Sequence, residues 1–298
     1  MTHNQFRGTG VALVTPFHSD GSIDFNCFKK LIDHVIGGGV EYLVPLGTTG
    51  ESVTLNKNEK QAVLNFVLEA NDNRVPVVLG LGGNNTRDIA EQLNNLDMDG
   101  ITAILSVSPY YNKPSQAGIF EHYKTIANNS PLPVILYNVP SRTGSNIAAE
   151  TTLHLANEIK NIIGIKEASG NIEQCMQIIN EKPKDFLVIS GDDNLTLPLI
   201  ACGFDGVISV VGNAYPKEFS NMVRTALNSE FDKARKLHYR LFEITKLLFA
   251  EGSPGGVKEL LHLKNICQTH LRLPLVGVSE KLKAAMKELV ENEERVVV

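Results

Sequence analysis

Five short polar segments each follow an apolar run, and their side chains together suit Schiff-base chemistry. Lys166 ends the run Ile162–Ile165. Because burying an ammonium group is costly, a lysine at the end of a buried strand is driven towards its neutral, nucleophilic amine. Such an amine condenses with a ketone or an aldehyde, and the protonated imine is an electron sink for making or breaking a neighbouring C–C bond. Position alone leaves open a lysine paired with Glu167 or extended to solvent.

Two other segments could assist that lysine. Tyr137 ends the run before that of Lys166, and a phenol can transfer protons during imine formation when its hydroxyl is linked to other hydroxyls. Thr48 and Thr49, within Gly47–Gly50, offer hydroxyl and backbone N–H groups suited to a small carboxylate. A packed tyrosine and an ordinary turn are the alternatives, so only convergence on Lys166 favours a site.

The elements that must position these residues recur along the chain. Each apolar, β-branched run is followed by a segment with helical periodicity. Strands that are apolar on both faces need cover on both sides, which a closed barrel or a doubly wound sheet supplies. The even recurrence favours a (β/α)8 TIM barrel, in which active sites lie at the C-terminal ends of the strands. The eight runs begin near Val11, Tyr42, Val75, Ala103, Val134, Ile162, Leu187 and Val207.

The helices between these strands are expected over residues 24–36, 58–70, 86–96, 115–128, 148–156, 171–179, 195–201 and 216–227. Asn58 and Thr86 are the expected N-caps of two of them, and Pro216 lies in the first turn of another. The strand pattern stops after residue 227, and helices follow over 231–250, 255–262 and 279–291. We therefore predict an α/β protein with a catalytic barrel over residues 1–227. A three-helix C-terminal appendage over 228–298 is expected to carry none of this chemistry.

Composition excludes several classes of function. The 298 residues are 43% hydrophobic, and 28 Lys and Arg against 33 Asp and Glu give a net charge of -5 without a basic run, so no nucleic-acid partner is expected. No apolar stretch reaches the length of a membrane helix, so no membrane partner is expected either. The absence of CxxC spacing and of a signal-type N-terminus indicates reduced thiols in a cytoplasmic protein. The four cysteines are Cys27, Cys175, Cys202 and Cys267.

Other catalytic chemistries have little support. No HxH or HExxH pair occurs, so a metal site is not expected. The Gly80–Gly83 segment lacks the spacing of a nucleotide-binding loop, and no GxSxG elbow occurs.

Five motifs occur in order along the chain: Gly47–Ser52, Tyr110–Pro114, Tyr137–Gly144, Gly164–Ala168 and Ser190–Asp193. Together they resemble the motifs of the 4-hydroxy-tetrahydrodipicolinate synthases, also called dihydrodipicolinate synthases. This family belongs to the pyruvate-dependent class I aldolases, which work through a Schiff base. The resemblance extends from about Gly8 into the C-terminal helices, and five motifs together are far more specific than one.

This resemblance implies a reaction and a set of roles. Lys166 would form an imine with pyruvate, and the derived enamine would attack L-aspartate 4-semialdehyde to give 4-hydroxy-tetrahydrodipicolinate, in lysine and diaminopimelate biosynthesis. No cofactor beyond this covalent imine is implied. Tyr137 would donate and accept protons, linked through Thr48 to Tyr111. In the family the last tyrosine comes from a neighbouring subunit, so a dimer at least is expected, and a tetramer is common.

The resemblance also implies how the substrates are held. Thr49 would bind the pyruvate carboxylate and Arg142 the carboxylate of the semialdehyde, while Gly191 and Ile208 would contribute backbone contacts around the imine. Because each of the two substrates carries a carboxylate, a planar guanidinium near the entrance of the site is favoured independently.

Two other functions remain open. N-acetylneuraminate and keto-deoxy sugar-acid lyases share the barrel, the lysine and the tyrosine, but as a rule lack the Ser-Arg-Thr-Gly run found at Ser141–Gly144. A barrel that binds a small oxo-acid without turnover is a more distant alternative.

An allosteric site for L-lysine is a further expectation from the resemblance. Ser52, Asn84 and Tyr110 match the pattern of feedback-inhibited members, with Asp88 in place of the usual glutamate. However, Lys57 stands where a histidine is typical, and Lys60 adds a second positive charge. Because like charges repel a cationic ligand, we predict weak or absent inhibition by L-lysine.

Overall fold

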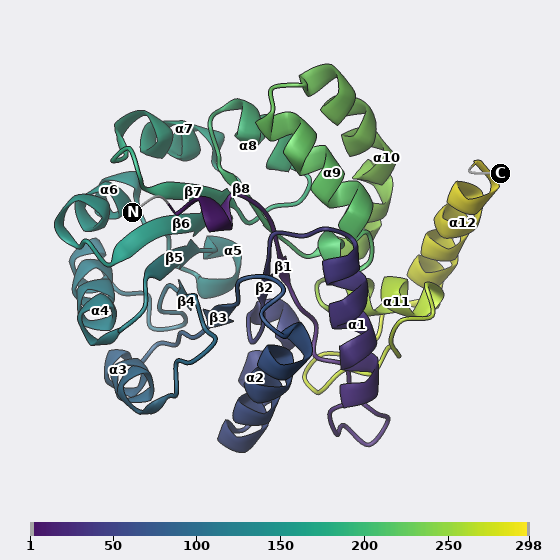
Figure 1. The fold of residues 1–298 in the computed structure, drawn as a ribbon, viewed down its shortest axis with the longest axis horizontal. Coiled ribbons are helices and arrows are strands. Elements are labelled where there is room, and N and C mark those ends of the chain that lie inside the picture. The colour runs from purple at the N-terminus through teal and green to yellow at the C-terminus, as the bar shows by residue number, and fades with distance from the viewer. Residues whose placement is uncertain (1–2, 297–298) are drawn as a thin grey trace.

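Eight parallel strands alternate with helices in the computed structural model, which describes residues 3–296 (Figure 1). Hydrogen bonding places the strands in the order β2-β1-β8-β7-β6-β5-β4-β3, and a parallel bridge between Leu43 and Val77 brings β2 against β3. The strands therefore close into the predicted barrel. Their bounds are β1 (Gly8–Ala12), β2 (Tyr42–Val44), β3 (Val78–Gly80), β4 (Ala103–Val107), β5 (Val134–Asn138), β6 (Ile162–Glu167), β7 (Leu187–Ser190) and β8 (Gly206–Ser209).

Helices surround the strands, and Figure 1 shows α10, α11 and α12 on the side of the barrel opposite α4. Most helices begin and end within one or two residues of the predicted bounds. Within residues 3–296 no helix has the length and apolar character needed to span a bilayer. The helices are α1 (Phe25–Gly37), α2 (Lys57–Asn71), α3 (Thr86–Asn95), α4 (Gln116–Asn129), α5 (Pro140–Thr143), α6 (Ala149–Glu158), α7 (Ile172–Glu181), α8 (Thr196–Ala201), α9 (Pro216–Leu227), α10 (Phe231–Phe249), α11 (Gly255–Leu263) and α12 (Glu280–Val296).

The two predicted N-caps are wrong. Helix α2 is capped by Asn56, whose side chain accepts from the backbone N–H of Glu59 while the Glu59 carboxylate accepts from the backbone N–H of Asn56. This reciprocal capping box satisfies two otherwise unpaired donors, which Asn58 within the first turn could not do. Helix α3 is capped by Asn85, one residue before the predicted Thr86.

Apolar side chains form two layers, one inside the barrel and one between the strands and the helices. Phe6, just before β1, and Tyr42, the first residue of β2, pack edge to face with ring centroids 5.7 Å apart. Both side chains are fully buried, so they close the N-terminal end of the barrel interior. Polar chemistry is thereby confined to the opposite end, where the strands end.

Candidate active site

A register shift between β5 and β6 turns Lys166 towards the barrel interior. Val134 pairs with Ile162, but the next residue of β5 pairs with Gly164, so β6 contains one extra residue. Ile163 consequently packs inside the barrel, whereas Ile165 packs in the outer layer. Without this shift the alternation of β6 would direct Glu167 inwards, because successive strand residues face opposite sides.

Lys166 is enclosed by its neighbours on β5 and β7. Its side chain is only 5% exposed, and Nζ lies 4.3 Å from the centroid of the Tyr137 ring, on the strand position that pairs with Lys166. Gly191 follows β7, and a Cβ atom there would lie 2.9 Å from Lys166 Cε. The missing side chain at Gly191 therefore provides the room that the lysine occupies. A solvent-exposed Lys166, one alternative left open by the sequence, is wrong.

Glu167 does not pair with Lys166, because it lies on the outer side of the barrel. Its carboxylate accepts from Asn138 Nδ2 at 2.9 Å, from Gln174 Nε2 at 3.0 Å and from the backbone N–H of Ser169 at 2.6 Å. These bonds connect the ends of β5 and β6 to α7, on the outer side of the strands that carry Tyr137 and Lys166. Sequence reasoning missed this support, although the polar Asn138 and Glu167 at neighbouring strand ends were a signal for it.

Thr48 and Thr49 form a tight turn after β2, as expected. The turn spans Thr48–Gly50, with Thr49 buried and Thr48 exposed. Thr15 Oγ1 donates a hydrogen bond to the carbonyl of Gly50 at 2.7 Å. Glu51 closes the turn with its N–H bonded to the carbonyl of Thr48 at 3.1 Å.

A cavity of about 740 Å³ at the C-terminal end of the strands connects three predicted residues, Thr48, Tyr137 and Arg142. Arg142 lies on the short helix α5 and is exposed, and its Nη2 donates to the carbonyl of Ser253 at 3.4 Å. Ile208 is 1% exposed and lies in the barrel interior on β8. One cavity is therefore lined by a phenol, a hydroxyl and a guanidinium, and Lys166 Nζ lies 4.3 Å from the ring centroid of the same phenol.

Tyr111 stands apart from these residues within the single chain. Its side chain is 88% exposed, and its backbone has φ 73°. The N–H of Tyr111 donates to the carbonyl of Thr143 at 3.2 Å, which anchors the loop next to α5. A non-glycine residue with positive φ is strained, so the loop holds the ring outwards at a conformational cost.

The predicted allosteric residues border the same cavity. Its lining includes Ser52, Asp88 and Tyr110 together with Lys57 and Lys60. The fourth predicted residue adjoins them, because Asn84 Nδ2 donates to the carbonyl of Tyr110 at 3.2 Å. Glu91 also borders the cavity, but it already forms an ion pair with Arg87 at 2.8 Å.

Asp193 stabilises the backbone at the end of β8, a role for which the sequence offered no prediction. Its Oδ2 accepts from the backbone N–H groups of Val210 at 3.1 Å and Val211 at 3.3 Å. Complete burial raises the pKa of this carboxyl to about 6. Among residues 3–296 no group of three or more histidine, cysteine, aspartate or glutamate side chains is arranged to hold a metal ion.

Comparisons with known proteins agree along almost the whole chain. The model of the dihydrodipicolinate synthetase family matches residues 5–293. The 4-hydroxy-tetrahydrodipicolinate synthase of Flavobacterium psychrophilum is 55% identical over 277 residues, which cover 93% of this chain and 94% of that protein. The same enzyme of Parabacteroides distasonis is 50% identical over 293 residues, covering 97% and 99%. The crystal structure of dihydrodipicolinate synthase from Aquifex aeolicus matches with a TM-score of 0.94 at 38% identity and covers 97% of this chain and 98% of that chain.

Proposed function

Because this chain belongs to the dihydrodipicolinate synthetase family, we propose that Lys166 is the residue on which its reaction takes place. The enzyme condenses pyruvate with L-aspartate 4-semialdehyde to give 4-hydroxy-tetrahydrodipicolinate. The observation that carries the assignment to Lys166 is its enclosure beside the Tyr137 ring at the open end of the barrel.

Every step of the proposed reaction can be written with Lys166 as the nucleophile and the leaving group. The amine of Lys166 adds to C2 of pyruvate, and loss of one water gives the imine. Loss of a proton from C3 gives the enamine, whose C3 then forms the new C–C bond to the aldehyde carbon. The amine of the semialdehyde finally displaces Lys166 from C2, which closes the ring and frees the lysine. The protonated imine is the electron sink when the C3 proton is lost, and it forms again when the enamine makes the C–C bond.

Tyr137 is the proton donor and acceptor in this proposal, linked through Thr48 to Tyr111 of a second copy. Support comes from the shared cavity of Tyr137 and Thr48 and from the outward ring of Tyr111. Since Tyr111 extends into solvent within its own chain, the relay is complete only in a dimer or a larger assembly such as a tetramer.

Thr49 and Arg142 bind the two carboxylates, with Gly191 and Ile208 beside the imine. A guanidinium binds a carboxylate through two parallel hydrogen bonds, and the exposed position of Arg142 leaves the donors other than the one bonded to Ser253 accessible to the second substrate. The catalytic unit is the barrel over residues 1–227, and no resident cofactor or metal takes part. The four free cysteines fit a cytoplasmic compartment.

Reductive trapping tests the assignment. Sodium borohydride with pyruvate should add covalent mass to the wild-type protein at Lys166 and none to Lys166→Ala. No gain in the wild type, or the same gain in Lys166→Ala, would refute it. A second assay offers L-aspartate 4-semialdehyde and N-acetylneuraminate to the same preparation. Turnover of only the sugar acid would favour the lyase alternative, which shares the lysine and the tyrosine.

A further inference from the structure

A fully buried ion pair joins the C-terminal helices to the turn that carries Thr48 and Thr49. Lys258 on α11 donates from Nζ to Glu51 Oε1 at 2.5 Å, and both side chains are 0% exposed. Lys258 also donates to the carbonyl of His270 at 2.8 Å, and Glu51 Oε2 accepts from the N–H of Arg272 at 3.0 Å. Both charged groups therefore have hydrogen-bond partners although neither is exposed to water.

The energetics of such a pair point to positioning more than to stability. Taking two charges out of water costs several kcal/mol each, and a well-packed apolar pair is often equally stable. What the pair does supply is a fixed geometry. Glu51 has φ 53°, a strained left-handed conformation, and its N–H closes the turn by bonding to the carbonyl of Thr48. Holding the Glu51 carboxylate therefore holds the end of the turn.

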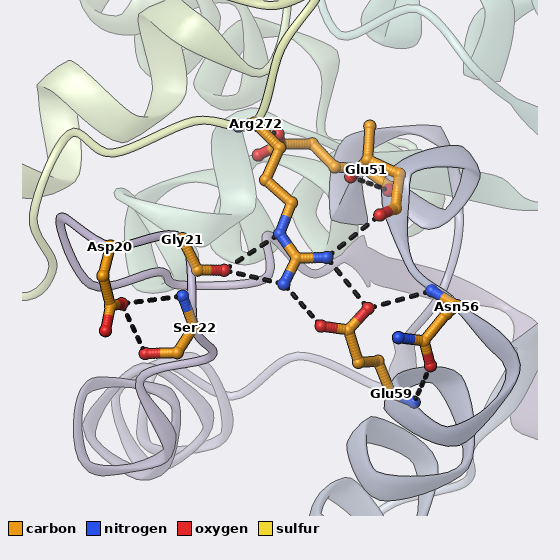
Figure 2. Close-up of polar contacts among 8 residues, drawn as sticks. Asp20, Gly21, Ser22, Glu51, Asn56, Glu59 and Arg272 are labelled. Atoms are coloured by element: carbon orange, nitrogen blue, oxygen red, sulfur yellow. Dashed lines mark hydrogen bonds and ion pairs between the residues drawn. The ribbon is translucent and has the colours of Figure 1, made fainter.

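The segment that follows α11 anchors the surroundings of the same turn. Figure 2 shows the Arg272 guanidinium between Gly21 and Glu59, close to Glu51. Arg272 also donates from Nη1 to the carbonyl of Thr54 at 2.9 Å. The C-terminal segment thus holds Glu51 and the residues that follow it, as well as the loop before α1.

We propose that Lys258 is a positioning residue for the pyruvate site, acting through Glu51 on the Thr48–Gly50 turn. Lys258 has no exposed surface with which to touch a substrate, so its effect passes through the turn to Thr49. This inference rests on the proposed function, in which Thr49 binds the carboxylate of pyruvate.

The matched test compares the two ion pairs that flank β2. Glu51→Gln/Lys258→Met removes the buried pair without leaving one charge alone. The control Glu41→Gln/Arg224→Met removes the pair just before β2, where Glu41 bonds to Arg224 Nη1 at 2.8 Å and to the Thr9 N–H at 2.6 Å. The readouts are the pyruvate concentration for half-maximal borohydride trapping, the trapped yield at saturation and the melting temperature.

We expect the half-maximal pyruvate concentration of the buried-pair variant to rise by about tenfold or more, because misplacing a binding group by about an ångström is costly. Its trapped yield at saturation should stay near that of the wild type. The control should shift by less than about twofold even if it melts earlier. A folded buried-pair variant with wild-type pyruvate dependence would overturn the inference. No trapping in the wild type would instead reject the proposed function.

A milder pair of variants keeps the test decisive if the double variant does not fold. Glu51→Asp keeps the charge but shortens the side chain by one methylene. Either the carboxylate loses its bond to Lys258, or the backbone of the turn moves towards Lys258 to keep it. The variant should raise the pyruvate requirement about threefold or more, against no change in Glu41→Asp. Equal pyruvate dependence in the two Asp variants would refute the positioning role.

Discussion

Replacing Gly191 by alanine should impair catalysis through Lys166 with little effect on the rest of the fold. The added Cβ would lie 2.6 Å from Ala168 Cβ and 2.9 Å from Lys166 Cε, whereas ordinary contacts begin at 3.4 Å. The neighbours must therefore move by about 0.8 Å and about 0.5 Å. Overpacking of this kind costs roughly 1–3 kcal/mol of stability. A displacement of half an ångström to one ångström at a reacting group lowers the rate by roughly tenfold to a hundredfold.

The assay is the single-turnover rate of pyruvate trapping at saturating pyruvate, with urea unfolding in parallel. Gly38→Ala is a matched control. Gly38 caps the end of α1, and an added Cβ would lie 2.5 Å from the Cβ atom of Pro216 on α9, which is a similar overlap. The control should lose comparable stability and keep the wild-type rate. If Gly191→Ala folds and traps pyruvate at the wild-type rate, the enclosure of Lys166 by Gly191 is irrelevant to catalysis.

Three further outcomes are expected. Tyr111→Phe should lose about 10²-fold in turnover, since a proton-transfer group is removed. Mixing it with Lys166→Ala should restore about a quarter of wild-type activity, because a mixed dimer contains one site with both Lys166 and Tyr111. No restoration would argue against a relay between subunits. Burial raises the pKa of Asp193 to about 6, so the folded protein holds this proton more tightly than the unfolded chain, and the resulting stabilisation is present below about pH 4 and lost as the pH rises to about 6. Asp193→Asn should therefore be more stable than the wild type at pH 7.5, by about 3 kcal/mol at most, and no more stable at pH 4, as read from urea midpoints; an equal difference at both pH values would contradict this. Millimolar L-lysine should leave activity nearly unchanged because Lys57 and Lys60 border the cavity, and half-inhibition below 1 mM, roughly, would show that their repulsion is overcome.

The strand and helix order could be predicted because it depends on local pattern. Apolar runs with turn residues between them identify strands, and the helical period identifies the helices that cover them. The N-caps of α2 and α3 were placed wrongly because asparagines and a threonine lie close together there, and only the completed hydrogen bonds identify Asn56 and Asn85 as the caps. The buried pair of Glu51 and Lys258 had no local signal, since 207 residues separate the partners.

The sequence by itself determined which chemistry is available, because side-chain type decides it: an amine, a phenol, paired hydroxyls and a guanidinium, each placed after an apolar run. It did not determine which of two adjacent residues, Lys166 or Glu167, enters the barrel. Strand alternation has a period of two, so a shift of one residue reverses the facing of everything beyond it. The pairing of β6 with β5 contains that shift and directs the lysine inwards. Only the closed sheet, in which each strand takes its register from its neighbours, could decide this.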